Sequence, residues 1–414
     1  MSERTELRVG DHIGFLSGFP FNSDYFHQEE GTRLIRIRDL VEAEGETFYR
    51  GAFDRRWLIN AGDILIGMDG DFNIVRWRGG EALLNQRILK AEGKPGGSID
   101  PNYFFFWCAP YLTQVHNRTA ATTVKHLSVR DIERAKDAFP PTSEQRRIAE
   151  ILSTVDEAIE QTEALVGKWQ QMKAGLMHDL FTRGVSPEGH LRPTRTQAPH
   201  LYQQSRLGWI PKEWEVKPLG SFTQHDITYG IVQAGSHVEG GIPYVRTGDM
   251  WGNHLVREQM LCTTRSIADS YKRSEIRSGE IVCAIRATVG KVLRVPPELD
   301  GANLTQGTAR IAPHSRVSAA FLLWAIRSER TQRSISLSIK GTTFMEITLG
   351  DLRSLPLAAP RSMEEQELIG SRLDDCDAAI ETEEAHLAKL RQQKQGLMHD
   401  LLTGRVRVAV AGGG

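Results

Sequence analysis

Two long stretches of the chain carry apolar residues at alternating steps of four and three. Residues 144–180 and 365–401 align without a gap at an offset of 221, and 19 of the 37 aligned positions are identical. A heptad seam kept for about five heptads predicts a long helix that pairs with a second one as a coiled coil. The seam and docking positions are Ile148, Leu152, Val155, Ile159, Val166, Trp169, Gly175, Leu176 and Leu180, with Ile369, Leu373, Ile380, Leu387, Leu390, Gly396, Leu397 and Leu401 in the second copy. Thr162, Lys173, Cys376, Glu383 and Lys394 complete the seam.

Two features inside these helices depart from the apolar pattern. Gly175 and Gly396 each cost about 1 kcal/mol relative to alanine. A glycine at the same place in both copies predicts close approach of another backbone, from the other helix or from a partner protein. His178 and His399 have no second ligand near them in the sequence, which favours a polar contact over a metal site.

Shorter runs repeat upstream of each helix. They are rich in Val, Ile and Leu and are bounded by Gly, Asp and Asn, a pattern typical of strands and turns. The pairs are 34–40 with 244–250, 61–68 with 278–285, 85–89 with 305–311, and 122–132 with 342–352. Residues 104–112 and 319–328 predict one buried helix in each copy. The chain is therefore expected to be two α+β domains and an antiparallel pair of long helices, divided as 1–140, 141–182 (first helix), 183–206 (linker), 207–360 and 361–406 (second helix).

The linker sets the expected direction of the second helix. As a flexible coil its roughly 22 residues would span about 26 Å, well short of a helix of about 55 Å. The second helix should therefore run back antiparallel, which would place one domain at each end of the helix pair. Such a molecule could bind two DNA half-sites whose spacing depends on the length of the helices.

Composition narrows the class of protein. The chain has 51 Lys and Arg against 52 Asp and Glu, four scattered cysteines, no apolar run long enough for a membrane span, and a charged N-terminus. A cytoplasmic protein with no membrane association is expected. Residues 206–360 hold 19 Lys and Arg against 14 Asp and Glu, and Arg outnumbers Lys, which suits contacts to phosphate or guanine as well as ordinary salt bridges.

Motifs for catalysis are missing from the sequence. It has no Asn/Asp-Pro-Pro-aromatic loop for adenine methylation and no Gly-x-x-x-x-Gly-Lys-Ser/Thr loop for ATP. Asp63, Asp69 and Asp71 could suggest a metal-dependent nuclease, but Asp69 aligns with Arg286 and no Glu-x-Lys follows at suitable spacing. These acids are interpreted as turn residues, and the chain is expected to be non-catalytic with no metal of its own.

The repeated segments resemble one family. An E-Q-x-x-I helix start, a G-L-M-H-D-L helix end, the run LGWIPKEWEVKPLG (207–220) and the ending LTGRVRV (402–408) are similar to the specificity subunit of type I restriction-modification systems. One departure is Arg361, where a second proline is usual before the helix. The resemblance covers essentially the whole chain and implies two target-recognition domains, each for one half of a split sequence in double-stranded DNA.

The resemblance also implies partners. Two modification subunits with S-adenosylmethionine chemistry on adenine N6 would dock on the helices, and complexes that also cleave DNA would add restriction subunits that use ATP and Mg²⁺. No cofactor is expected on this chain. The alternative is a coiled-coil scaffold that gathers partner proteins, with globular ends that bind protein instead of DNA. Salt-sensitive binding to a two-part DNA sequence would distinguish the two.

The candidate DNA contacts are polar loop residues that recur in both copies, with nearby basic residues. The first group is Arg36 with Arg246, Asn85 and Gln86 with Thr305 and Gln306, and Thr122 and Thr123 with Thr342 and Thr343. The second group is Arg76, Arg78, Lys125, Arg286 and Lys340. Asn and Gln can pair bidentately with adenine, and Arg with guanine. For each residue the alternative is a hydrogen bond within a turn or at a strand end.

Overall fold

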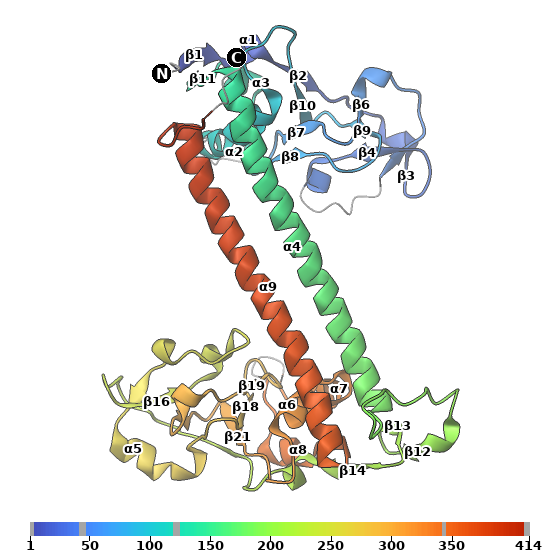
Figure 1. The fold of residues 1–414 in the computed structure, drawn as a ribbon, viewed down its shortest axis with the longest axis vertical. Helices are drawn as coiled ribbons and strands as arrows, with labels where there is room; N and C mark the ends of the chain where they lie inside the picture. The colour runs from blue at the N-terminus through green and yellow to red at the C-terminus, as the bar shows by residue number, and fades with distance from the viewer. Residues whose placement is uncertain (1–3, 41–46, 119–124, 342–344, 410–414) are drawn as a thin grey trace. The chain divides into compact units, whose positions relative to one another are not determined.

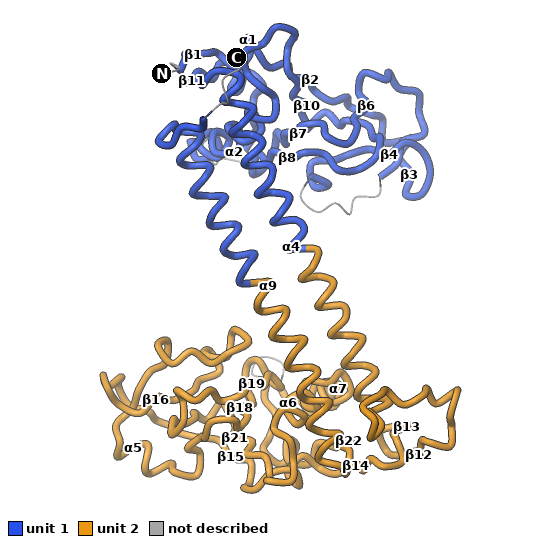
Figure 2. The backbone as a smooth tube through the Cα atoms, in the orientation of Figure 1, with its two compact units in different colours: residues 1–163, 385–414 blue, residues 164–384 orange. Residues whose placement is uncertain are grey.

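The computed structural model describes residues 4–40, 47–118, 125–341 and 345–409. The chain divides into two compact units, and each long helix contributes one part to each unit (Figure 2). Unit 1 comprises residues 1–163 and 385–414, and unit 2 comprises residues 164–384.

The two long helices begin and end close to the predicted positions. Helix α4 runs from Thr142 to Arg183 and helix α9 from Met363 to Thr403 (Figure 1). Ser362 caps α9, because its hydroxyl accepts the backbone N–H of Glu365 at 3.2 Å. Glycines with positive φ follow both helices, at positions 184 and 404, where a left-handed residue ends a helix without steric cost.

The helix pairing is antiparallel in each unit, as predicted. Residues further along α4 contact residues earlier in α9. In unit 1 the contacts are Asp156–Lys394 at 2.6 Å and Glu163–Arg391 at 2.7 Å; in unit 2 they are Gln170–Glu384 at 3.4 Å and Lys173–Asp377. The two sets are repeat equivalents at the offset of 221, so both copies of the repeat make the same kind of cross-helix contact.

The globular part of unit 1 is built from short strands around one long buried helix. Its elements are β1 (Thr5–Arg8), α1 (Val9–His12), β2 (Ile13–Ser17), β3 (Phe26–His27), β4 (Thr32–Ile35), β5 (Phe48–Tyr49), β6 (Leu58–Ile59), β7 (Ile64–Gly67), β8 (Ile74–Arg76), β9 (Ala82–Leu84), β10 (Ile88–Gly93), α2 (Pro101–Arg118), α3 (Val129–Glu133) and β11 (Lys136–Phe139). The strands form sheets in the orders β2-β10-β7-β8, β3-β5-β4-β9-β6 and β1-β11, with β4 and β9 parallel.

Unit 2 repeats this topology after its first hairpin. Its elements are β12 (Tyr202–Ser205), β13 (Gly208–Pro211), β14 (Trp214–Pro218), β15 (Thr228–Tyr229), β16 (Ile242–Val245), β17 (Cys262–Thr263), α5 (Arg265–Ser270), β18 (Ile281–Ala284), β19 (Val292–Arg294), β20 (Asn303–Leu304), β21 (Thr308–Ile311), α6 (Ala319–Arg327), α7 (Glu329–Ser338), α8 (Leu349–Ser354) and β22 (Pro356–Pro360). The order β15-β21-β18-β19 matches β2-β10-β7-β8, the parallel pair β16–β20 matches β4–β9, and β14–β22 matches β1–β11. The duplication seen in the sequence is therefore a duplication of fold.

The long helices belong to the hydrophobic cores of the units. In unit 1, Ile148 and Leu152 pack in one core with Tyr103, Phe104 and Phe139. In unit 2 the equivalent Ile369 and Leu373 pack in one core with Trp214, Phe321 and Trp324. Because each helix supplies fully buried side chains, the predicted borders at 140 and 360 separate segments that share one core.

Several expected strands are shorter than predicted. Residues 34–40 contain strand β4 followed by the 3₁₀ helix η2 (Ile37–Leu40), and 244–250 contain β16 followed by η6 (Thr247–Met250). In each case the carboxylate of an aspartate, Asp39 or Asp249, accepts the backbone N–H three residues earlier at 2.8 Å. This local hydrogen bond competes with the strand and turns the chain. Residues 129–133 and 349–354 are likewise the helices α3 and α8.

Helix α4 begins at Thr142, whose hydroxyl donates to the carbonyl of Ser98 at 3.3 Å. One further expectation needs correction. The linker is not a flexible coil: Val185 and Leu191 form a β-bridge, β12 and β13 form a hairpin, and the Arg192 side chain is buried. Among the described residues no helix is long and apolar enough to span a bilayer.

Candidate nucleic-acid interface

Backbone hydrogen bonds bring four loop segments together in unit 1. The amide of Gln86 donates to the carbonyl of Phe19 at 3.2 Å, and the amide of Met68 donates to the carbonyl of Arg87 at 2.9 Å. A β-bridge joins Asp69 to His126. The parallel pair Ile35–Leu84 adds a fifth segment, because Arg36 and Asn85 follow these two residues. We call the set Phe19, Arg36, Asp69, Asn85, Gln86, Arg87 and His126 the first loop cluster.

The same pattern recurs in unit 2. The amide of Gln306 donates to the carbonyl of Ile231 at 3.0 Å, and the amide of Ile285 donates to the carbonyl of Gly307 at 2.9 Å. A β-bridge joins Arg286 to Glu346. We call the set Ile231, Arg246, Arg286, Thr305, Gln306, Gly307 and Glu346 the second loop cluster. The two clusters have one backbone plan, and their side chains differ at five of the seven equivalent positions; the arginines Arg36 and Arg246 and the glutamines Gln86 and Gln306 are the same.

A glycine allows the closest approach in each cluster. A Cβ atom added at Gly18 would lie 2.1 Å from the carbonyl oxygen of Asn85, and one added at Gly230 would lie 1.9 Å from that of Leu304. No other residue fits without a shift of the backbone. These glycines hold the first segment of each cluster against the turn that carries the Asn85–Gln86 or Thr305–Gln306 pair.

Charged pairs surround the first loop cluster. The Asp69 carboxylate lies 2.7 Å from Nδ1 of His126 and 3.4 Å from Nε of Arg87. The Arg36 guanidinium stacks over the Phe26 ring at 5.0 Å. Gln86 is exposed, so its amide is available to a ligand.

The second loop cluster has its own pairs. Arg246 donates two hydrogen bonds to Asp249, at 3.0 Å and 2.6 Å, and these bonds raise the pKa of Arg246 above its ordinary value. Nε of Arg286 lies 3.1 Å from Glu346, and both side chains are about half exposed. Gln306 is exposed, like Gln86.

The remaining candidates fall in three places. Lys125 donates to the carbonyl of His116 at 2.6 Å, and Lys340 lies 3.0 Å from Asp351; each is next to its cluster in the chain fold. Arg76 and Arg78 lie elsewhere, facing helix α4. Thr122, Thr123, Thr342 and Thr343 lie outside the described residues.

Arg76 and Arg78 line a cleft of about 1200 Å³ between the globular part of unit 1 and α4. Arg78 contacts Glu160, and the Arg76 guanidinium stacks over Phe105 at 5.1 Å. Burial lowers the pKa of Arg76, against the opposing effects of Asp156 and Asp100. The structure does not bring these two arginines together with the other candidates. The carboxylates of α4 in this cleft would also repel a phosphate backbone.

Sequence reasoning missed Asp69, Arg87 and His126 as members of the first cluster. Asp69 had been considered only as a nuclease acid and rejected because it aligns with Arg286. Asp63 is a turn acid, because its carboxylate accepts the amide of Asn60 at 2.9 Å. Within the described ranges no group of three or more His, Cys, Asp or Glu could hold a metal ion.

The glycines of the long helices are exposed. A Cβ added at Gly175 or Gly396 would meet nothing within 4 Å, so the other helix does not approach either of them. The expectation that the two helices approach each other closely at these glycines is wrong. The other predicted reason for a glycine at both positions, close approach of a partner protein, stays a prediction.

The exposed helix positions separate into two groups. Positions exposed in both copies before residue 163, such as Glu150 with Ser371 and Glu157 with Ala378, all differ. The identical exposed residues are Glu163, Ala164, Lys168, Gln171, Gly175 and His178, with Glu384, Ala385, Lys389, Gln392, Gly396 and His399. From Ala164 to His178 the spacing alternates between four and three, so these residues share one face of the helix. We call this face, from Ala164 to His178 and from Ala385 to His399, the repeated stripe; the first copy lies in unit 2 and the second in unit 1.

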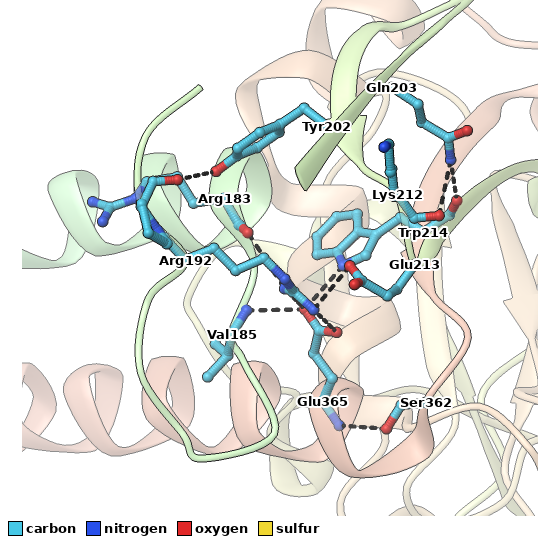
Figure 3. Close-up of polar contacts among 11 residues, drawn as sticks. Arg183, Val185, Arg192, Tyr202, Gln203, Lys212, Glu213, Trp214, Ser362 and Glu365 are labelled. Atoms are coloured by element: carbon cyan, nitrogen blue, oxygen red, sulfur yellow. Dashed lines mark hydrogen bonds and ion pairs between the residues drawn. The ribbon is translucent and has the colours of Figure 1, made fainter. Parts of the chain in front are cut away.

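A buried ion pair fastens the segment after α4 to the start of α9 (Figure 3). Glu365 receives two hydrogen bonds from Arg192, at 2.6 and 2.9 Å, one from the amide of Val185 at 2.9 Å and one from Nε1 of Trp214 at 2.9 Å. Both charged side chains are 7% exposed. Burial alone would lower the pKa of Arg192, but the hydrogen bonds and charge of Glu365 outweigh burial and raise it.

Comparison with known proteins gives consistent matches. A family model for the type I restriction modification DNA specificity domain matches residues 37–165 and 211–392. Over 94% of its length the chain is 28% identical to the type I restriction enzyme EcoBI specificity subunit of Escherichia coli, 83% of which is covered. It is 26% identical to the MjaVIII specificity subunit of Methanocaldococcus jannaschii, over 97% of this chain and 92% of that one. The crystal structure of an S subunit from M. genitalium superposes with a TM-score of 0.64 at 13% identity, covering 97% of this chain and 96% of that chain.

Proposed function

The chain belongs to the type I restriction-modification DNA specificity family, and from this membership we propose that each loop cluster recognises one half of a two-part sequence in duplex DNA. The observation that carries the proposal is the pair of clusters. They have the same backbone hydrogen bonds, but their side chains differ at five of the seven equivalent positions. A conserved frame with variable polar groups is what two readers of different half-sites require, because base contacts specify and the frame only positions.

The exposed glutamines Gln86 and Gln306 suit adenine, and the arginines of both clusters suit guanine or phosphate. Residues 206–360 also carry an excess of Lys and Arg over Asp and Glu, 19 against 14, which favours a polyanion as ligand. We expect Lys125 and Lys340 to contact phosphates at the cluster margins.

The repeated stripe is proposed as the docking surface for two modification subunits. Its residues are exposed and identical in the two copies, whereas the exposed residues on the rest of each helix differ. Two equal surfaces fit two equal partners. The glycine in each stripe leaves room for a partner backbone to approach closely. S-adenosylmethionine would be bound by those modification subunits, ATP and Mg²⁺ by restriction subunits where present, and the complex would act in the cytoplasm.

Replacing Gly175 and Gly396 together by leucine is expected to stabilise the helices and to weaken docking of the modification subunits. Each replacement should stabilise the helix by somewhat under 1 kcal/mol, because leucine is a better helix former than glycine and nothing lies within 4 Å. Docking should fall at least tenfold, because the new side chains occupy the space meant for the partner. Thermal unfolding and size-exclusion chromatography with the modification subunit measure the two effects.

The matched control replaces Ala174 and Gln395 by leucine. These positions are exposed but differ between the copies, so they lie outside the repeated stripe. The control should assemble as the wild type does. Equal loss of assembly in both double variants, or none in either, would contradict the docking surface.

The DNA-binding role is tested by gel shift of the chain assembled with its modification subunits. The expected result is affinity that requires both halves of a two-part duplex and falls steeply with salt, since phosphate contacts release counterions. Binding without sequence preference at any salt concentration would instead support a protein scaffold.

A further inference from the structure

The central residues of the two loop clusters have opposite hydrogen-bonding character. Asp69 and Arg286 occupy equivalent places: the residue before each donates its amide to the turn at Arg87 or Gly307, and each forms a β-bridge to the returning segment. The centre of the first cluster is therefore an acceptor, and the centre of the second is a donor.

The side chains that pair with these two residues differ in the same way: Asp69 has basic neighbours, and Arg286 has an acidic one. Asp69 lies between two basic groups, His126 at 2.7 Å and Arg87 at 3.4 Å. Arg286 lies beside an acid, Glu346, at 3.1 Å. A carboxylate that faces DNA is repelled by phosphates. The Arg87 guanidinium and the His126 ring beside Asp69 reduce that repulsion. The first cluster has this arrangement, and it leaves the Asp69 side chain 23% exposed.

Arg286 is also open to a ligand. Its side chain is 48% exposed, as is that of Glu346, and a pair this exposed to water exchanges partners readily. The neighbouring Gly307 has no side chain to cover the guanidinium, whereas the equivalent position in the first cluster carries Arg87. The position next to the central residue therefore differs as well as the central residue itself.

We propose that Asp69 and Arg286 are specificity-determining residues, in which Asp69 accepts a hydrogen bond from the N4 amino group of a cytosine in one half-site and Arg286 donates to O6 and N7 of a guanine in the other. The inference rests on the proposed function. A carboxylate is the natural acceptor for cytosine N4, and an arginine is the natural bidentate donor to guanine. Each half-site must then contain a G·C pair, contacted through opposite members of that pair.

The test begins with the target of the wild-type complex. The chain is co-expressed with its modification subunits, and methylated adenines in the host DNA are mapped. Asp69→Ala should relax discrimination at one G·C pair of one half-site by roughly 5- to 150-fold, and Arg286→Ala should do so at one G·C pair of the other. Glu346→Gln, which removes the ion pair but keeps the arginine, tests whether that pair is needed. Arg277→Gln, which changes an exposed arginine of unit 2 outside both loop clusters, should leave the target unchanged.

Modified duplexes test the same contacts atom by atom. Replacing the guanine by 7-deazaguanine should weaken binding of the wild-type complex but not of the Arg286→Ala complex. A cytosine analogue that lacks the 4-amino group should weaken binding of the wild-type complex but not of the Asp69→Ala complex. This assay needs assembly but no methylation, so it also covers a variant that binds DNA without modifying it.

Three results would overturn the inference: a half-site without a G·C pair, equal loss of affinity for all sequences, or relaxation in both half-sites from one substitution. The same effect from Glu346→Gln would show that Arg286 acts only through its ion pair. A wild-type target that is not in two parts would instead contradict the proposed function itself.

Discussion

Replacing Glu365 by alanine is expected to destabilise unit 2 by about 3–5 kcal/mol, the cost of leaving one member of a buried ion pair without its partner. The carboxylate serves Arg192, the Val185 amide and the Trp214 indole together, and all three would lose an acceptor in a site closed to water. Domains are stable by only about 5–15 kcal/mol, so the loss is a large fraction of the total. Urea unfolding followed by circular dichroism measures it.

Two variants give this prediction its controls. Glu367→Ala changes an exposed glutamate on the same helix turn and should alter stability by less than about 0.5 kcal/mol. Arg192→Met with Glu365→Leu removes both charges and should recover the part of the loss that comes from the unpaired charge, although the Val185 amide and the Trp214 indole still lack an acceptor. A double variant as unstable as Glu365→Ala would show that the ion pair is not the cause.

Replacing Gly230 by alanine is expected to abolish recognition of one half-site. The added Cβ would lie 1.9 Å from the Leu304 carbonyl oxygen, so the segment carrying Ile231 must move away from the turn that carries Thr305 and Gln306. Such overpacking typically costs about 1–3 kcal/mol, which leaves the unit folded but its second loop cluster displaced. Binding of the assembled complex to duplexes altered in one half at a time is the measurement.

Gly248→Ala is the matched control for Gly230. Gly248 lies in the same unit, directly after Arg246 and Thr247, and a Cβ there would meet nothing within 4 Å. It should bind as the wild type does. Gly18→Ala, which would place a Cβ 2.1 Å from the Asn85 carbonyl oxygen, should affect the other half-site. Loss of both halves from either glycine variant would count against two independent clusters.

The long helices and the duplicated domains could be predicted because periodicity and self-similarity are properties of the sequence alone. The seam residues Ile148, Leu152, Ile369 and Leu373 are fully buried. The linker was misjudged for a physical reason. Its Pro-rich composition suggests a coil, but the burial of Arg192 depends on Glu365, which is 173 residues away.

The roles of the identical Glu-Gln pairs were also beyond the sequence. Gln145 accepts the Asp100 amide at 2.8 Å and donates to the Pro140 carbonyl at 2.8 Å. Gln366 accepts the Ser318 amide at 3.0 Å and donates to the Pro360 carbonyl at 2.9 Å. Each glutamine therefore ties the start of a long helix to the entry of the buried helix before it. Periodicity identifies the helix, but only the folded chain shows this contact.

The candidate interface was predictable only in part. Matching the two copies found the turns at Asn85 and Thr305 and the arginines Arg36 and Arg246, because equivalent loops have equivalent places in the fold. Arg286, Arg76 and Arg78 were selected as nearby basic residues. Arg286 lies in the second loop cluster, whereas Arg76 and Arg78 face α4. The charge of a residue alone does not determine which face of a strand its side chain occupies; the packing of the folded chain does.

The proposed function requires that each unit recognises its own half of a two-part DNA target. The most direct measurement is the map of methylated adenines made by the wild-type chain and by Gly230→Ala, each co-expressed with the modification subunits. For the wild type we expect two defined sequences separated by an undefined gap. For Gly230→Ala we expect specificity to be lost in only one of the two halves. A single continuous target, or a variant that alters both halves, would contradict the proposed function.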